Sequence, residues 1–127
     1  MKLRMQGNSI RLRVTRSELS RLQTGQRLDE AVRFGSRPGM TLGYSLQAGT
    51  QADPIVVTFE AQQILVTMSG EQLENWSSEH QVGVYASLPI DSSATLEVAI
   101  EKDFACLDRS DEHNTDTFAN PLAGTLC

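Results

Sequence analysis

Two pairs of cationic residues, each pair separated by one residue, are the first candidates for a binding site in this chain. Lys2 and Arg4 lie in one alternating segment and Arg11 and Arg13 in the next, with Gly7-Asn8 between them. Alternation of apolar and polar residues around a Gly-Asn pair is typical of a β-hairpin. Such a hairpin places Arg4 opposite Arg11 and Lys2 opposite Arg13. Because like charges facing each other repel by a few tenths of a kcal/mol, we expect negative charge nearby.

That negative charge has two possible sources. One is internal, in late carboxylates such as Glu97 and Glu101; the other is a bound phosphate or carboxylate, which the planar fork of arginine grips with two parallel donors. A solvated sheet face, an ion-pair network between the two halves of the chain and an anion site all remain open. The candidate ligand-binding residues are Lys2, Arg4, Arg11, Arg13, Arg33, Glu97, Glu101 and Lys102.

The C-terminal segment, residues 104–127, combines a thiol, an imidazole and several carboxylates. Its candidates for a metal site are Cys106, Asp108, Asp111, Glu112, His113 and Asp116. Their spacing matches neither the paired cysteines of a zinc site nor the calcium-loop pattern. The competing interpretation is an acidic tail that Phe104, Leu107 and Phe118 attach to the rest of the protein. No cofactor is indicated, and the sequence has no HExxH, no Gly-rich phosphate loop and no Ser-His-Asp order, so we favour a non-enzymatic protein.

The elements that must position these residues are repeated. The pattern of residues 2–49 reappears at residues 56–103 with a constant shift of 54, as in Ile10 and Ile64 or Leu19 and Leu73. Each copy predicts a hairpin, a short helix and a second hairpin. Capping boxes over residues 15–18 and 69–72 predict where the helices begin. The second hairpins join residues 28–34 to 40–46 and residues 82–88 to 96–100.

The predicted fold is therefore α+β, an internally duplicated ββαββ unit with eight mostly antiparallel strands and two short helices. The strands could close into a barrel or form two packed sheets. We expect one domain over residues 1–127, because neither copy is long enough to be stable alone.

Charge is divided unevenly along the chain. The net charge is −5, but residues 1–49 carry +6 and residues 50–127 carry −11, which favours attraction between the halves. Aromatic residues are only 6% and none lies among the cations, which argues against nucleic acid as a partner. No apolar run approaches the roughly 20 residues of a membrane span, and the first residues alternate instead of forming a signal peptide. A cytoplasmic protein with Cys106 and Cys127 as thiols is expected.

Several segments resemble a family of small uncharacterised bacterial proteins, a domain of unknown function. They are Met1-Lys2-Leu3-Arg4, residues 7–13, residues 100–107, Asp111-Glu112, Asp116 and Asn120-Pro121. The resemblance runs to about Pro121, with Ala119 where the family typically has a proline. It implies no activity, and it emphasises the basic hairpin and residues 101–106.

Three functional hypotheses follow. The first is a non-enzymatic cytosolic domain that binds a small anionic ligand or a protein partner through Arg4, Arg11 and Arg13. The second is a metal-dependent phosphate-ester or triphosphate hydrolase in a charge-lined barrel, in which Glu97, Glu101 and Asp103 hold the metal. The third is a structural or oligomeric interaction module.

Overall fold

The order of elements is two strands, a helix, four strands, a helix and two strands. The structure, a computed structural model, describes residues 1–104. Its elements are β1 (Lys2–Gln6), β2 (Ser9–Val14), α1 (Arg16–Gln23), β3 (Leu28–Arg33), β4 (Thr41–Gly49), β5 (Ile55–Glu60), β6 (Gln63–Ser69), α2 (Gly70–Trp76), β7 (Gly83–Pro89) and β8 (Thr95–Lys102). Neither helix in this described part is long and apolar enough to cross a membrane.

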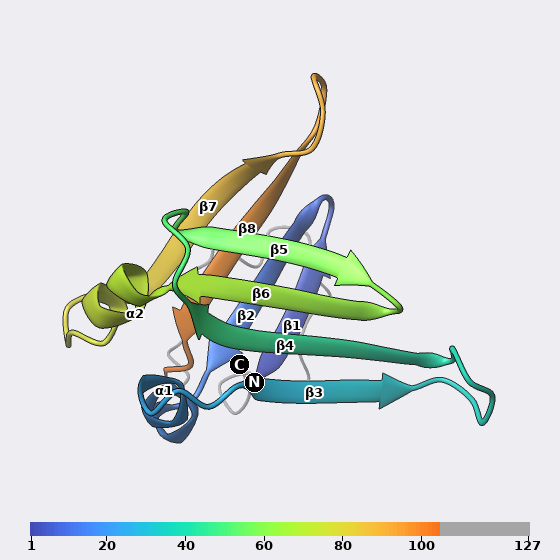
Figure 1. The fold of residues 1–127 in the computed structure, drawn as a ribbon, viewed down its shortest axis with the longest axis horizontal. Coiled ribbons are helices and arrows are strands. Elements are labelled where there is room, and N and C mark those ends of the chain that lie inside the picture. Colours follow the sequence, from blue (N-terminus) through green and yellow to red (C-terminus); the bar gives the residue numbers. More distant parts are fainter. Residues whose placement is uncertain (105–127) are drawn as a thin grey trace, which may run out of the picture.

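The strands form two separate four-stranded sheets, which cross as two layers in Figure 1. One sheet has the order β1-β2-β8-β7 and the other β3-β4-β6-β5. The four hairpins are antiparallel, and the parallel pairs β2–β8 and β4–β6 join them in twos. The predicted α+β class and two packed sheets are confirmed. The barrel alternative is wrong, because within residues 1–104 β1, β7, β3 and β5 remain sheet edges and no strand joins the two sheets. The sheets pack against each other through their apolar faces.

Each sheet takes its first hairpin from one half of the chain and its second hairpin from the other. At one junction Leu12 of β2 pairs with Ile100 of β8; at the other, Val66 of β6 pairs with Leu46 of β4. A shift of 54 residues converts Leu12 into Val66 and Leu46 into Ile100, so the two junctions have the same register. Duplication would produce this agreement, although duplication itself stays a prediction.

The β1–β2 hairpin has the register that its sequence predicts. Lys2 pairs with Arg13 and Arg4 pairs with Arg11. Gly7 in the turn has a φ of 56°, a left-handed conformation that glycine adopts without steric cost. The four cations therefore lie on one side of the hairpin.

The two helix starts differ. At α1 the capping box is complete, because Thr15 accepts from the Glu18 backbone N–H and Glu18 accepts from that of Thr15 at 3.0 Å. At α2, Ser69 accepts from the Gln72 N–H at 3.2 Å, but the described structure records no return bond from the Gln72 side chain. The second prediction is thus half right. The Ser69 backbone N–H already donates to the Pro54 carbonyl at 2.9 Å, so the donor that Gln72 would satisfy is occupied.

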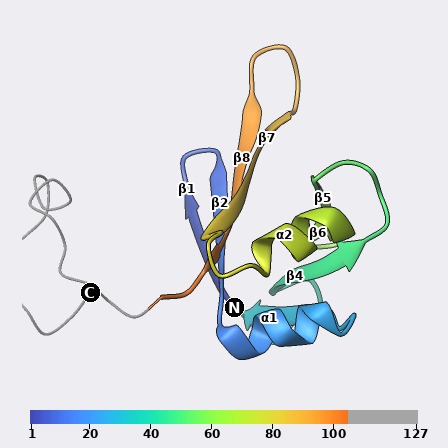
Figure 2. The same ribbon diagram turned by 90° about the vertical axis from the view of Figure 1, so that its left-hand side faces the viewer.

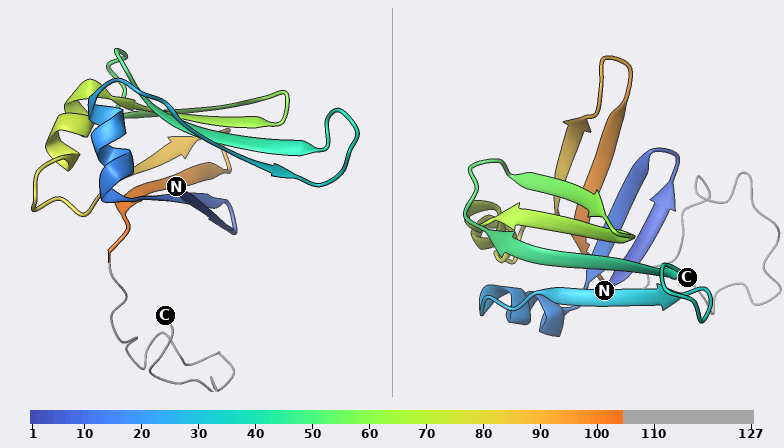
Figure 3. Two further views of the ribbon diagram at one scale, coloured as in Figure 1. Left: turned by 90° about the horizontal axis from the view of Figure 1, so that it is seen from below. Right: turned by 45° about the vertical axis from the view of Figure 1, so that its right-hand side comes forward.

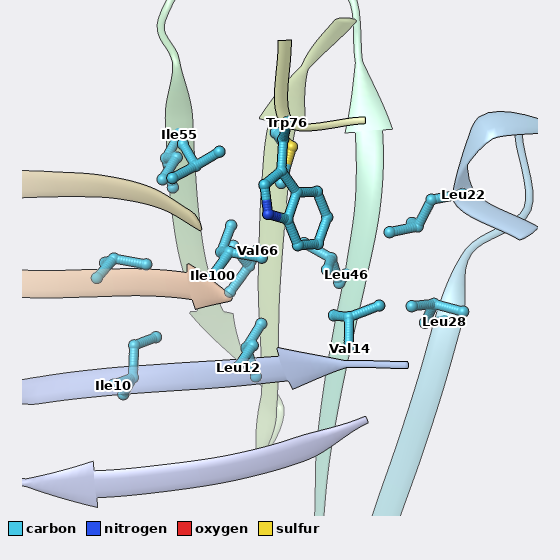
Figure 4. Close-up of a cluster of buried hydrophobic side chains, with 13 residues drawn as sticks. Ile10, Leu12, Val14, Leu22, Leu28, Leu46, Ile55, Val66, Trp76 and Ile100 are labelled. Carbon is cyan, nitrogen blue, oxygen red and sulfur yellow. The ribbon is translucent and has the colours of Figure 1, made fainter. Parts of the chain in front are cut away.

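The core lies where the helices close one end of the two sheets (Figures 2 and 3). Trp76 of α2 is fully buried among Leu46, Val66 and Ile100, and its indole N–H donates to the Val82 carbonyl at 3.1 Å (Figure 4). Leu22 contributes from α1. Away from the helices the sheets spread apart, as Figure 3 shows. Several inward-facing apolar side chains of the strands are exposed, among them Met5, Val32 and Phe59. Within residues 1–104 no helix or strand covers the outer face of the β1-β2-β8-β7 sheet (Figure 2).

Candidate functional site

The outer face of the β1-β2-β8-β7 sheet carries the four hairpin cations, Lys2, Arg4, Arg11 and Arg13, which we call the basic face. Arg11 is half-buried and the other three are exposed. The Lys2 ammonium lies 3.3 Å from an Asp103 carboxylate oxygen, and Arg11 Nε lies 3.1 Å from Oε1 of Glu101. Within residues 1–104 no carboxylate lies in ion-pair contact with Arg4 or Arg13. As far as the described residues go, the basic face is therefore open to water and only partly neutralised.

A shallow depression adjoins the basic face at the middle of β8. Ala99 pairs with Arg11 of β2 on one side and with Tyr85 of β7 on the other. A methyl group between two long side chains leaves a hollow of about 310 Å³. Its outward-facing lining residues are Ser9, Arg11, Tyr85, Ser87, Glu97 and Ala99. The register of β8 thus positions one cation and one phenol on opposite walls.

Glu101 connects the two walls. Its Oε1 pairs with Arg11 Nε, and its Oε2 accepts a hydrogen bond from the Tyr85 hydroxyl at 2.8 Å. The bond to this carboxylate raises the pKa of Tyr85, and burial and the Glu101 charge add to the effect. One carboxylate thereby holds side chains of β2, β8 and β7 in place across the sheet.

Gly83 leaves room for the phenol of Tyr85. A Cβ atom at residue 83 would lie 2.8 Å from the Tyr85 hydroxyl oxygen and 2.9 Å from the Ile100 carbonyl oxygen. Both contacts are shorter than ordinary van der Waals separation, and the second involves backbone. Glycine at this position is therefore part of what allows Tyr85 to reach Glu101.

Glu97 forms the polar end of the depression. Its Oε2 accepts from the Ser87 hydroxyl at 2.5 Å and its Oε1 accepts from the Thr95 hydroxyl at 3.1 Å. No group of three or more histidine, cysteine or acidic side chains within residues 1–104 is placed to hold a metal ion. The predicted metal set of Glu97, Glu101 and Asp103 instead binds hydroxyls and cations. Because the sheets are open, the charge-lined barrel of the hydrolase hypothesis does not exist in this part of the chain.

The structure brings together six of the eight predicted ligand-binding residues on this face: Lys2, Arg4, Arg11, Arg13, Glu97 and Glu101. Lys102 points to the opposite side of β8, where its ammonium donates to the Ser78 carbonyl at 2.6 Å. Arg33 belongs to the other sheet, where it pairs with Thr41. The C-terminal metal candidates Cys106, Asp108, Asp111, Glu112, His113 and Asp116 lie outside the described residues.

Sequence reasoning missed the far wall of the depression. Tyr85 alternates with the inward-facing Val84 and Ala86, so its outward direction was available from the sequence. Its place beside Arg11 was not available, because that requires the parallel pairing of β2 with β8.

Comparison with curated proteins and with solved structures found no match. A family described as a family of unknown function, DUF7009, matches residues 1–122, which include all the strands and helices that the structure describes and the whole depression. The match confirms the predicted resemblance to an uncharacterised family; a bacterial origin stays a prediction. The chain belongs to DUF7009.

Proposed function

We propose that this protein is a non-enzymatic binding domain that holds a small anionic ligand on the outer face of the β1-β2-β8-β7 sheet. The observation that carries the proposal is that Arg4 and Arg11 face each other in register, while the one carboxylate among residues 1–104 in contact with the pair, Glu101, reaches only Arg11. An anion between the two guanidinium groups would relieve their mutual repulsion. A cytosolic location is part of the proposal.

The depression suggests how the rest of the ligand is held. A carboxylate or phosphate lies against Arg11 and Arg4, and the ligand body extends over Ala99 against the ring of Tyr85. The volume of about 310 Å³ is at the small end of the range for ligand pockets, which favours a small molecule.

The carboxylates at the two ends of the depression favour a ligand of mixed character. Glu97 lines one end and Glu101 lies beyond the other, two residues to either side of Ala99 on β8, so an extended polyanion such as nucleic acid would be repelled. Carboxylate oxygens accept hydrogen bonds, so ligand hydroxyl or ammonium groups suit these positions. We therefore expect one anionic group together with hydrogen-bond donors.

We further propose that the chain arose by duplication and that only the first copy carries this site. Val56, Thr58, Leu65 and Thr67 stand 54 residues after Lys2, Arg4, Arg11 and Arg13. The equivalent positions of the β3-β4-β6-β5 sheet therefore lack the cluster of cations that an anion needs.

The same arginine-to-glutamine substitution, made inside and outside the proposed site, tests the proposed function. Arg4→Gln and Arg11→Gln should each weaken calorimetric binding of citrate or pyrophosphate at low salt by about tenfold, the lower end of the 1.5 to 3 kcal/mol range of a charge-assisted hydrogen bond. Arg33→Gln, on the other sheet, is the control and should bind as the unaltered protein does. Equal affinity in all four proteins, or no heat with either anion, would refute the proposal.

A further inference from the structure

We infer that β5 is a pairing edge through which two copies of this chain associate, antiparallel, about Val57. β5 is the outermost strand of the β3-β4-β6-β5 sheet, and its free side has no strand partner within residues 1–104. The N–H and C=O groups on that side are available to a strand of another molecule. This edge belongs to the other sheet from the proposed ligand site, and the inference does not depend on that site.

The other three edge strands carry features that oppose pairing. β1 carries Lys2 and Arg4, β3 carries Glu30 on the side that faces the other sheet, and β7 ends at Pro89. Edge charges, inward charges and proline are the usual devices against edge-to-edge association. β5 has none of them, since its sequence IVVTFE holds a single charge, at its last residue.

β5 and β1 make a matched comparison because they stand 54 residues apart and occupy equivalent edges. Self-pairing of β1 about Leu3 would place Lys2 opposite Arg4 of the second molecule, which is repulsive. The residues of β5 at the places of Lys2 and Arg4 are Val56 and Thr58. The feature that keeps β1 from pairing with itself is therefore missing in β5.

An exposed aromatic side chain marks the free edge. Phe59 lies on the same side of the sheet as Val57 and the buried Ile55, yet it is 65% exposed. Phe59 is the next-to-last residue of β5, and this end of the strand lies away from the helices, where the two sheets spread apart (Figure 3). A second strand along β5 would cover it.

The side-chain pattern selects one register. Residues directly opposite in an antiparallel pair share a face, so a symmetric pair must be centred on a residue. Centring on Val57 places Ile55 opposite Phe59 and Val56 opposite Thr58, and Glu60 falls outside the strand, opposite Pro54. Centring on Thr58 would instead place Glu60 opposite Val56. The first register buries apolar side chains and creates no contact between like charges.

The size of the contact limits its strength. The surface buried by pairing of one six-residue strand is small compared with the roughly 1,600 Å² buried in a standard protein–protein interface. The dimer should therefore dissociate on dilution. Each chain carries a net charge of −5, and salt screens the repulsion between copies. Dimerisation should thus strengthen with salt, whereas anion binding on the basic face should weaken.

Sedimentation velocity on the full chain, from about 10 µM to about 1 mM, tests the association. We expect a dimer fraction that rises with protein concentration. Thr58→Lys should lower the association constant of the dimer at least tenfold. Thr41→Lys, which adds the same charge at the first residue of β4, should dimerise normally. A monomer at every concentration, or equal dimerisation of both variants, would overturn the inference.

Disulfide trapping tests the register independently of affinity. In a Cys106→Ser/Cys127→Ser background, Val57→Cys should form a covalent dimer on mild oxidation, because symmetric residues face each other about 4.5 to 5.5 Å apart between Cα atoms. Thr58→Cys should not, since Thr58 faces Val56 of the second copy. Trapping through Thr58→Cys alone would contradict the register.

Discussion

Removal of the Glu101 charge should strengthen anion binding. In the structure Glu101 neutralises Arg11 through a contact of 3.1 Å, and its other oxygen accepts from Tyr85. Glu101→Gln keeps the size and an acceptor for Tyr85, but it frees the Arg11 guanidinium for the ligand. The substitution therefore changes the charge beside the depression while the strands remain in place.

The magnitude follows from the geometry. A ligand anion seated on the far side of Arg11 would lie about 7 Å from the Glu101 carboxylate, and removal of that repulsion in a water-like environment is worth about 0.6 kcal/mol. This corresponds to about a threefold gain in affinity at low salt and less at physiological salt, where the Debye length is about 8 Å. Stability should fall by no more than about 1 kcal/mol, because Arg11 is 40% exposed and such pairs are weak.

Calorimetric titration with citrate in about 10 mM salt is the assay, and Glu60→Gln is the control. Glu60 has the same charge but lies at the end of β5, in the other sheet, so it isolates the local effect from the change in net charge. Unchanged or weaker binding by Glu101→Gln would refute the reasoning. An equal gain in the Glu60→Gln protein would show that net charge alone is responsible.

Three further predictions follow from the local structure. Gly83→Ala should lower the free energy of unfolding by about 1 to 3 kcal/mol in chemical denaturation, because its Cβ meets Tyr85 and backbone. Thr15→Ala and Ser69→Ala should each lower it by about 1 kcal/mol in the same assay through loss of a helix cap, and a change of under a few tenths would contradict the cap assignments. In ultraviolet titration Glu101→Gln should lower the raised pKa of Tyr85 toward its ordinary value; the stabilisation linked to that raised pKa is complete below pH 10 and is lost as pH rises through the folded-state pKa.

Local features of this fold could be read from the sequence because they depend on neighbours along the chain. The register of the β1–β2 hairpin, Arg4 opposite Arg11, follows from alternation and the Gly7-Asn8 turn. The start of α1 at Thr15 follows from the capping box. In each case the interacting residues lie within a few positions of one another.

The interleaving of the two halves could not be read from the sequence. Periodicity shows which side of a strand is apolar, but it does not show which distant strand becomes the neighbour. The parallel pairing of β2 with β8 places Ala99 between Arg11 and Tyr85, and the depression exists only because of it. The barrel alternative failed for the same reason, since closure depends on pairing between distant edges.

Lys102 and Arg33 were predicted to belong to the ligand site, but neither lies on the basic face. Lys102 follows Glu101 directly in β8, and successive strand residues point to opposite sides, so the sequence itself places them on different faces. Arg33 has the outward parity of the basic face but belongs to the other sheet, which no local pattern distinguishes.

A map of backbone amide shifts during titration with pyrophosphate is the sharpest test of the proposed ligand site, because it locates the bound anion without any substitution. We expect saturable shifts concentrated at Arg4, Arg11, Ala99 and Tyr85, with little change in the β3-β4-β6-β5 sheet. Shifts that are absent, or that gather on that second sheet, would contradict the proposed site.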